Sequence, residues 1–287
     1  MNDSRRDAVL VDAHELAARL DGGDPVVVLD VRWALGRTDG REQHTAGHVP
    51  GSVYVDLDTE LAAPPTPAAG RHPLPDALDL QAAARRWGVR AGVPVVALDA
   101  VGGTSAARVW WLLRWAGVPD VRILDGGLAA WVRAGGELQT GDVRPPPGDV
   151  VLHPGALPTL DADAAAALAG SGEGVLLDAR ATERYRGEVE PVDPRAGHVP
   201  GAVSAPTTAN LGSDGRYLPA DTLRSRFTAL GVTGDGTVGV YCGSGVTAAH
   251  EVAALASIGV DAALYPGSWS QWSSDPARPA ATGAEPG

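Results

Sequence analysis

Short apolar runs alternate with longer amphipathic stretches along most of the chain. The apolar runs lie at 25–31, 94–99, 174–179 and 237–242. Runs of this kind are typical of strands buried in a parallel sheet. The stretches between them have helical periodicity, and several end in Gly, as helix C-termini often do. These stretches span 13–20, 79–88, 105–117, 220–231 and 247–259. The alternation predicts an α/β fold in which helices cover both faces of a parallel sheet.

The chain contains this pattern twice. Three segments recur in the same order: LDVR (29–32) as LDAR (177–180), AGHVPGSV (46–53) as AGHVPGAV (196–203), and LDGGLAAW (124–131) as YPGSWSQW (265–272). The similar spacing indicates a tandem duplication of a unit of about 120–140 residues, which is the size of a domain rather than of a solenoid repeat.

Changes in composition suggest where the two copies begin and end. Residues 141–158 are rich in Pro and Gly and interrupt every periodic pattern, so we expect a linker there. Residues 276–287 have too little apolar content to pack, so we expect a disordered tail. The predicted domains are therefore an N-terminal one at 9–140 and a C-terminal one at 159–275.

The charge and hydropathy of the chain narrow the classes of function. It has 23 Lys and Arg against 35 Asp and Glu, a net charge of −12, so nucleic acid is not an expected partner. The first residues lack the apolar core of a secretory signal, and no stretch is long and apolar enough to span a membrane. We expect a cytoplasmic protein, in which an anionic substrate would need a locally positive pocket.

The chain has one cysteine, Cys242. A single cysteine excludes an intramolecular disulfide framework and a metal site built from several cysteines. No set of His, Asp and Glu residues has metal-ligand spacing, so we expect neither a metal nor another cofactor. Reducing conditions would keep the lone thiol available for chemistry.

The loop that begins at the cysteine has the features of an anion-binding turn. It follows the predicted strand at 237–242 and leads into the predicted helix at 247–259. Its residues are Cys242, Gly243, Ser244, Gly245, Val246 and Thr247. The two glycines allow successive backbone N–H groups to point inward, and the helix N-terminus adds unpaired N–H groups and a positive dipole end. A thiolate there should be stabilised and nucleophilic, and the hydroxyls of Ser244 and Thr247 add hydrogen-bond donors.

The corresponding loop in the first half provides an internal comparison. Alignment of residues 95–113 with 238–256 places Asp99 opposite Cys242. A carboxylate cannot act as a soft nucleophile, and within a ring of N–H donors it would repel other anions. We therefore expect the N-terminal domain to be catalytically silent.

The motifs together resemble the tandem-domain rhodaneses, the thiosulfate and 3-mercaptopyruvate sulfurtransferase family. The resemblance extends from about Val9 to Trp272. It rests on LDVR and LDAR, on AGHVPG in both halves, on Arg108 with Trp110 and Trp111, and on LDGGLAAW, CGSGVTA and GSWSQW. It implies two rhodanese-like domains and a persulfide mechanism, in which the cysteine takes sulfane sulfur from a donor. The sulfur then passes to cyanide or to a thiol, which could belong to a protein such as thioredoxin.

The resemblance also bears on the identity of the donor. Thiosulfate-preferring members carry two cationic side chains just after the cysteine, whereas this chain has Gly243 and Ser244 there. The neutral loop resembles the mercaptopyruvate type, so we expect 3-mercaptopyruvate as donor, with thiosulfate as the alternative. The family then implies that arginines from elsewhere bind the donor carboxylate. The residues at or near the matching positions are Arg184 and Arg195. The planar guanidinium group of an arginine is suited to bidentate binding of a carboxylate.

Several other residues invite a functional or a structural interpretation. His48 and His198 are equivalent in the repeat, which favours a structural role before the Pro-Gly turn. The resemblance suggests in addition that Asp39 and His48 line a cleft between the domains. Two tryptophans of GSWSQW, Trp269 and Trp272, are expected to pack in the core, and His250 is expected on the outer face of its helix.

Three other classes of protein are less consistent with the sequence. Cysteine phosphatases and arsenate reductases need an arginine six residues after the cysteine, and that position is Ala248. A cysteine protease would need a suitable His and Asn pair, which neither half offers. A non-catalytic rhodanese-like binding module would fit better if Cys242 were replaced as well.

Overall fold

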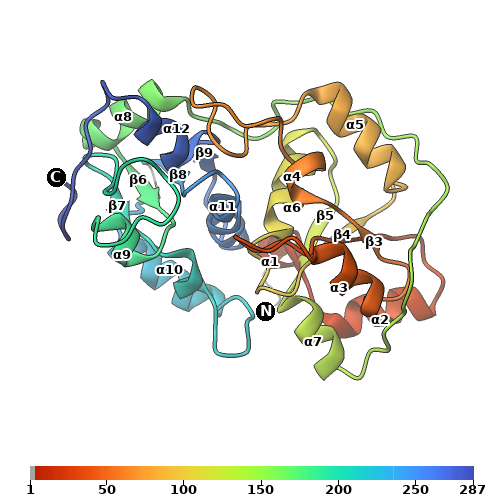
Figure 1. Ribbon diagram of the computed structural model, residues 1–287. Coiled ribbons are helices and arrows are strands. Elements are labelled where there is room, and N and C mark those ends of the chain that lie inside the picture. Colours follow the sequence, from red (N-terminus) through yellow and green to blue (C-terminus); the bar gives the residue numbers. More distant parts are fainter. Residues whose placement is uncertain (1–3, 235) are drawn as a thin grey trace. The chain divides into compact units, whose positions relative to one another are not determined.

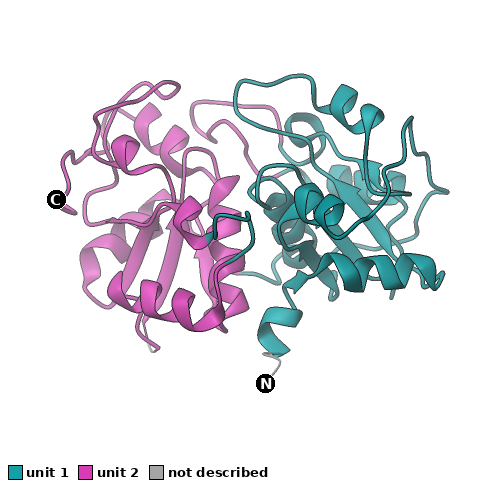
Figure 2. Ribbon diagram, turned by 90° about the horizontal axis from the view of Figure 1, so that it is seen from below, with its two compact units in different colours: residues 1–62, 75–157, 211–217 teal, residues 63–74, 158–210, 218–287 magenta. Residues whose placement is uncertain are grey.

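The computed structural model describes residues 4–234 and 236–287, which form two compact units (Figures 1 and 2). The first unit comprises Met1–Ala62, Pro75–Leu157 and Leu211–Tyr217, and the second comprises Ala63–Leu74, Pro158–Asn210 and Leu218–Gly287.

Each unit alternates strands and helices in the order that the sequence pattern predicts. The elements of the first unit are α1 (Ser4–Asp7), β1 (Leu10–Val11), α2 (Ala13–Asp21), β2 (Val27–Asp30), α3 (Gly40–Ala46), β3 (Val53–Tyr54), α4 (Leu57–Glu60), α5 (Ala77–Arg86), β4 (Val95–Leu98), α6 (Ala106–Trp115), β5 (Val121–Leu124) and α7 (Gly127–Arg133). Those of the second are α8 (Ala162–Ser171), β6 (Gly174–Asp178), α9 (Thr182–Tyr185), β7 (Val203–Ser204), the 3₁₀-helix η1 (Thr207–Asn210), α10 (Ala220–Ala229), β8 (Thr237–Tyr241), α11 (Thr247–Ser257), β9 (Ala262–Leu264) and α12 (Ser268–Ser274).

Both sheets are parallel and share one strand order. The first sheet runs β1-β5-β4-β2-β3 and the second runs β7-β6-β8-β9, so β2, β3, β4 and β5 correspond to β6, β7, β8 and β9. Where β1 pairs with β5 in the first unit, the second has a single parallel bridge between Thr159 and Leu264. The structure confirms the predicted α/β fold, with one parallel sheet in each unit.

Helices bury both faces of each sheet. In β4, Val96 and Leu98 belong to a core cluster with residues of α2 and α7. Because side chains alternate along a strand, Val95 and Ala97 point to the other face, where α6 packs against β4 and β5. The second unit is built in the same way, with α8 and α12 on one face of the sheet and α11 packed against β8 and β9.

The recurring LDxR and AGH motifs contact each other in both units. Arg32 pairs with Asp30 at 2.6 Å and donates to the carbonyl oxygen of Gly47 at 2.8 Å. Arg180 likewise pairs with Asp178 at 2.6 Å and donates to the carbonyl oxygen of Gly197 at 2.7 Å. The arginine therefore ties the end of a central strand to the turn before the next strand, which explains why both motifs recur together.

The units differ from the predicted domain boundaries at two loops. Residues 63–74 come from the first half of the chain but pack within the second unit, where Arg71 N donates to Ser270 Oγ at 3.0 Å. Residues 211–217 come from the second half but pack within the first unit, where Tyr217 N donates to Asp125 Oδ1 at 2.8 Å. The second unit therefore receives a segment that the sequence pattern assigns to the first domain.

The predicted linker and tail are both held by backbone hydrogen bonds. Residues 141–157 belong to the first unit, where His153 N, for example, donates a hydrogen bond to Ala116 O at 2.8 Å. The expectation of a disordered tail is wrong, because residues 276–287 lie along the second unit. Ala281 exchanges backbone hydrogen bonds with His198, and Gly201 N donates to Pro286 O at 2.6 Å. The tail is ordered through its backbone, so its low apolar content was not informative.

Within the described part of the chain, none of the helices combines the length and the apolar character that crossing a membrane requires.

Candidate active site

Cys242 lies directly after β8, at the carboxyl end of the sheet, and the helix α11 begins five residues later. The residue is 1% exposed, and its Sγ accepts a hydrogen bond from Gly245 N at 3.1 Å. Gly245 has a φ of +76°, and a Cβ there would lie 2.5 Å from Pro266 O. Only glycine allows this turn, so the sequence CGSG fixes the backbone N–H that faces the sulfur.

The start of α12 holds the cysteine in place from the other side. Cys242 N donates to Ser268 Oγ at 3.1 Å, and Trp269 N donates to Cys242 O at 2.9 Å. Ser270 N donates to Gly243 O at 2.9 Å. These three hydrogen bonds explain why the segment GSWSQW accompanies the cysteine loop in the sequence.

The corresponding loop of the first unit shows what its backbone binds. Asp99 is fully buried, and its carboxylate accepts four backbone N–H bonds of 2.8–3.0 Å. The donors come from the loop and from the first residue of α6: Val101, Gly103, Ser105 and Ala106. Gly102 has a φ of +74°, close to that of Gly245 at the equivalent position. The loop is therefore an anion-binding nest, and in the first unit the chain fills it with its own carboxylate.

A histidine that no sequence motif indicates contacts the cysteine loop. His72 lies in the 63–74 segment, and its Nδ1 is 2.7 Å from Ser244 Oγ. Both side chains are buried, at 8% and 5% exposure. The pair places an imidazole-bonded hydroxyl two residues after the nucleophile, where it can exchange a proton with a bound substrate.

Two guanidinium groups occupy the space above Gly243. A Cβ at Gly243 would lie 2.9 Å from Arg71 Nη2 and 3.3 Å from Arg184 Nη1. Asp193 holds both groups, since Arg71 Nε bonds its Oδ1 at 3.0 Å and Arg184 Nη2 its Oδ2 at 3.1 Å. The loop itself has no charged side chain, as its sequence indicates, but two cationic side chains lie beside it.

The comparisons with known proteins agree with this geometry. The rhodanese-like domain family matches residues 12–134 and 161–275. The chain belongs to the rhodanese family.

Curated relatives share nearly the whole length of the chain. It is 50% identical to the “Putative thiosulfate sulfurtransferase SseB” of Mycobacterium tuberculosis, over 97% of this chain and 98% of that one. It is 49% identical to the “Probable 3-mercaptopyruvate sulfurtransferase” of Pseudomonas aeruginosa, over 96% and 99%. The crystal structure of SseA from Escherichia coli, described as a 3-mercaptopyruvate sulfotransferase, superposes with a TM-score of 0.80 at 34% identity, over 91% and 98%. This rhodanese is therefore a sulfurtransferase, and two equally similar relatives carry names with different donors.

The structure separates the two arginines that the family resemblance suggested as donor ligands. Arg184 lies beside Gly243, as the preceding contacts show. Arg195 instead donates from Nε, Nη1 and Nη2 to backbone carbonyl oxygens at Trp272, Ser273, Asp275 and Arg278. These bonds hold the end of α12 and the chain after it, so the expected donor-binding role of Arg195 is replaced by a structural one.

The cleft residues suggested by the resemblance are placed differently from each other. His48 is fully buried, and its Nδ1 bonds His44 O at 2.7 Å, so it does not line a cleft. His198 makes the equivalent bond to Tyr185 O at 2.8 Å, in agreement with the structural interpretation of both histidines. Asp39 is 41% exposed in the first unit and accepts hydrogen bonds from Arg37 and Gln43. Its role at a cleft stays a prediction.

The helix after the cysteine loop is buried more completely than expected. His250 is fully buried and its Nδ1 is 2.7 Å from Thr207 Oγ1, so its predicted position on the outer face is wrong. The reason is that η1 covers this side of α11. Trp269 and Trp272 belong to the core of the second unit, as expected.

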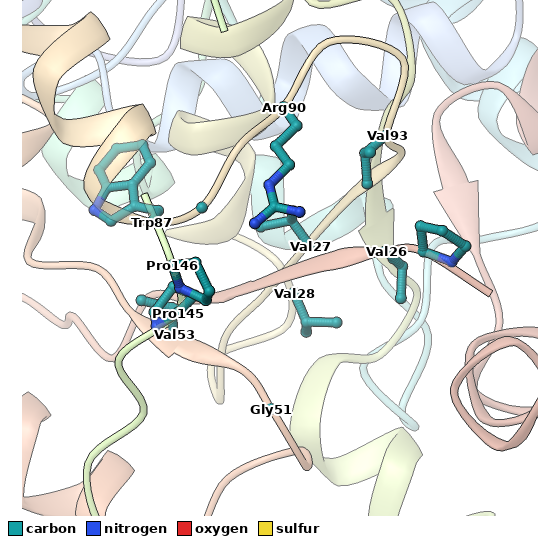
Figure 3. A pocket seen from close by; sticks show the side chains of 12 residues that line it. Val26, Val27, Val28, Gly51, Val53, Trp87, Arg90, Val93, Pro145 and Pro146 are labelled. Atoms are coloured by element: carbon teal, nitrogen blue, oxygen red, sulfur yellow. The ribbon is translucent and has the colours of Figure 1, made fainter. Parts of the chain in front are cut away.

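A hollow in the first unit lies at the opposite end of its strands. About 230 Å³ in volume, it is lined by residues at the beginnings of β2, β3 and β4 and by Trp87, Pro145 and Pro146, with Arg90 reaching toward Val27 (Figure 3). No nucleophile lines it. In the described residues no group of three or more His, Cys, Asp and Glu side chains is arranged to hold a metal ion.

Proposed function

We propose that this sulfurtransferase moves sulfane sulfur from 3-mercaptopyruvate to a thiol or to cyanide through a persulfide on Cys242. The observation that carries the proposal is the convergence on one loop of the thiol, the Ser244–His72 pair and the Arg184 guanidinium. Each of these groups can act on one part of a small α-keto thiol, namely its sulfur, its keto oxygen or its carboxylate.

In the first step the Cys242 thiolate attacks the sulfur of the donor. A sulfur–sulfur bond forms, the carbon–sulfur bond breaks, and its electron pair leaves on carbon as the enolate of pyruvate. The Ser244 hydroxyl, bonded to His72, is placed to donate to the developing enolate oxygen, and protonation of carbon then releases pyruvate. Arg184 binds the donor carboxylate and so orients the sulfur toward Cys242.

In the second step a thiolate or cyanide attacks the outer sulfur of the persulfide. The new bond forms to the acceptor, and the electron pair of the sulfur–sulfur bond returns to Cys242 as a thiolate. Asp99 in the first unit indicates how the loop stabilises such anions, because its carboxylate is held by N–H groups of the same turn. The first unit has no cysteine and is proposed to be catalytically silent.

Thiosulfate is the second candidate donor, because one of the relatives near 50% identity is named for it. The absence of cationic side chains at Gly243 and Ser244 favours mercaptopyruvate. We further propose that the reaction takes place in the cytoplasm and that a reduced protein dithiol such as thioredoxin can serve as the thiol acceptor.

The proposal is tested by measuring sulfur transfer with each donor, for the natural protein and for Cys242→Ser. We expect pyruvate release from 3-mercaptopyruvate, a lower kcat/KM with thiosulfate, and no transfer by the variant. Transfer by Cys242→Ser, or inactivity of the natural protein with both donors, would refute the mechanism. A preference for thiosulfate would refute only the choice of donor.

A further inference from the structure

We propose that Arg71 is a second donor-binding residue, which acts with Arg184 to bind a donor that carries a single carboxylate. The inference rests on the proposed function of the Cys242 loop. It adds a residue from a distant segment of the chain, which neither the family motifs nor the position of the cysteine points to.

Arg71 is the last member of a row of alternating charges. Asp178, at the end of β6, pairs with Arg180 at 2.6 Å, and Arg180 lies 3.5 Å from Glu190. Glu190 pairs with Arg184 at 2.7 Å. Asp193 then bridges Arg184 at 3.1 Å and Arg71 at 3.0 Å. The row thus leads from the buried centre of the sheet to the cysteine loop.

Exposure along this row increases only at its two outer cations. The Asp178, Arg180, Glu190 and Asp193 side chains are 0–4% exposed, whereas Arg184 is 16% and Arg71 is 24% exposed. Burial raises the pKa of Glu190, but the Asp193 amide and the Arg184 guanidinium outweigh it, so the pKa lies below its ordinary value. Glu190 therefore stays ionised behind the arginines, and an approaching ligand meets the more exposed guanidinium groups first.

The two exposed cations converge on the residue beside the nucleophile. Gly243 has no side chain, and the place that a Cβ would take is in contact with Arg71 Nη2 at 2.9 Å and Arg184 Nη1 at 3.3 Å. Cationic side chains on the loop itself would compete for this space. The chain supplies the positive charge from the 63–74 segment and from α9 instead.

The charge balance of the row favours a monoanion. Arg71, Arg180 and Arg184 are matched by three carboxylates, so the row is neutral as a whole. A bound carboxylate leaves one uncompensated negative charge, whereas a dianion such as thiosulfate leaves two, which costs more in a partly buried site. Two planar guanidiniums also match the two oxygens of one carboxylate.

Binding is tested separately from catalysis with the Cys242→Ser protein, which cannot form the persulfide. Calorimetry would measure the Kd of 3-mercaptopyruvate for Cys242→Ser, alone and combined with Arg71→Ala, Arg71→Lys or Arg186→Ala. Arg186 is the matched control, since it is 44% exposed and pairs with Glu188 at 3.9 Å. We expect Arg71→Ala to weaken binding about 10- to 100-fold, Arg71→Lys to restore part of it, and Arg186→Ala to change it less than about twofold.

An unchanged Kd in Arg71→Ala would overturn the assignment, and so would weakening equal to that in Arg186→Ala. This readout is independent of turnover. A protein that binds 3-mercaptopyruvate through Arg71 but transfers no sulfur would refute the proposed function and leave the binding role of Arg71 intact.

A double-mutant cycle tests the position of Arg71 at Gly243. Gly243→Ala is expected to raise KM for 3-mercaptopyruvate about tenfold by displacing the Arg71 guanidinium, with a smaller effect on kcat. In an Arg71→Ala background the added methyl group meets no guanidinium from this side, so Gly243→Ala should change KM less than about threefold. Full additivity of the two substitutions would show that Arg71 does not act at this place.

Discussion

Ser268 is the residue at which the two halves of the molecule differ most informatively. Its φ is +52°, and it is the one non-glycine residue with positive φ in the described part of the chain. The equivalent residue of the first unit is Gly127, with a φ of +56°. The second unit therefore retains a strained serine where glycine would be relaxed, and its hydroxyl accepts the N–H of Cys242 while donating to Tyr265 O.

This comparison predicts that two substitutions change stability by different amounts. Ser268→Ala keeps the strain and removes the hydrogen bonds, so the free energy of unfolding should fall by about 1–3 kcal/mol. Ser268→Gly also removes the bonds but relieves strain of about 1–2 kcal/mol, so it should be the more stable of the two variants. Urea unfolding measures the difference.

Both variants should have a lower kcat for sulfur transfer, because the N–H group of Cys242 loses its hydrogen-bond acceptor and the loop becomes less well positioned. If Ser268→Gly kept full activity, the hydroxyl would have no role in positioning Cys242.

The predicted site residues that the structure brings together are those whose sequence motifs are local, and their roles stay a prediction. Cys242, its glycines and Arg184 could be identified because they belong to short motifs. Arg71 and His72 could not, since they contact Ser270 and Ser244, 199 and 172 residues further along the chain. The available indication was an Arg-His pair in a Pro-rich loop without periodicity. Arg195 was misassigned because sequence distance to the AGH turn does not show where a long side chain reaches.

At the scale of elements, α11 links the nucleophile to a buried polar cluster. His250 and Glu251 lie in its first turns, and both are fully buried. Glu251 Oε2 accepts a hydrogen bond from Asn210 Nδ2 at 2.6 Å. Burial raises the pKa of Glu251 to about 7, against the opposing effects of Arg226 and of hydrogen bonds.

The raised pKa of Glu251 predicts how stability depends on pH. The carboxyl is neutral in both the folded and the unfolded chain below about pH 4.5, and its ionisation is penalised only in the folded protein. The stability of the fold with a neutral Glu251 carboxyl is therefore fully present at low pH and is lost as pH rises from about 4.5 through about 7. Across this range the free energy of unfolding of the natural protein should fall by on the order of 2–3 kcal/mol relative to that of Glu251→Gln.

Urea unfolding of both proteins at pH 5 and pH 8 measures this difference. The variant keeps a side-chain oxygen that can accept from Asn210, so the comparison isolates the charge. A stability difference between the two proteins that stays constant with pH would contradict the assigned burial of an ionisable Glu251.

Elements with strong periodicity could be predicted closely, whereas their caps and connections could not. The expected helix at 247–259 is observed at Thr247–Ser257, and the expected strand at 237–242 is observed at Thr237–Tyr241. Burial of His250 was missed because η1, a short 3₁₀ segment with no apolar pattern, covers that side of the helix. Contacts made by irregular segments leave no periodic trace in a sequence.

At the scale of the whole molecule, one fold carries two versions of the same loop. In the first unit four N–H groups enclose the carboxylate of Asp99, and in the second the same position holds a thiol. The duplication allowed the anion-binding character of the loop to be inferred from sequence and then compared with the occupied copy. The exchange of residues 63–74 and 211–217 between the units could not be inferred, because a repeat indicates equivalent positions and not which unit a loop joins.

The central claim is that sulfur is carried on Cys242, and intact-protein mass spectrometry tests it most directly. The protein would be treated with 3-mercaptopyruvate, freed of small molecules, measured, and measured again after cyanide is added. The natural protein should gain the mass of one sulfur atom and lose it to cyanide as thiocyanate, and Cys242→Ser should gain none. A protein that releases pyruvate without gaining this mass, or a Cys242→Ser variant that gains it, would contradict the account.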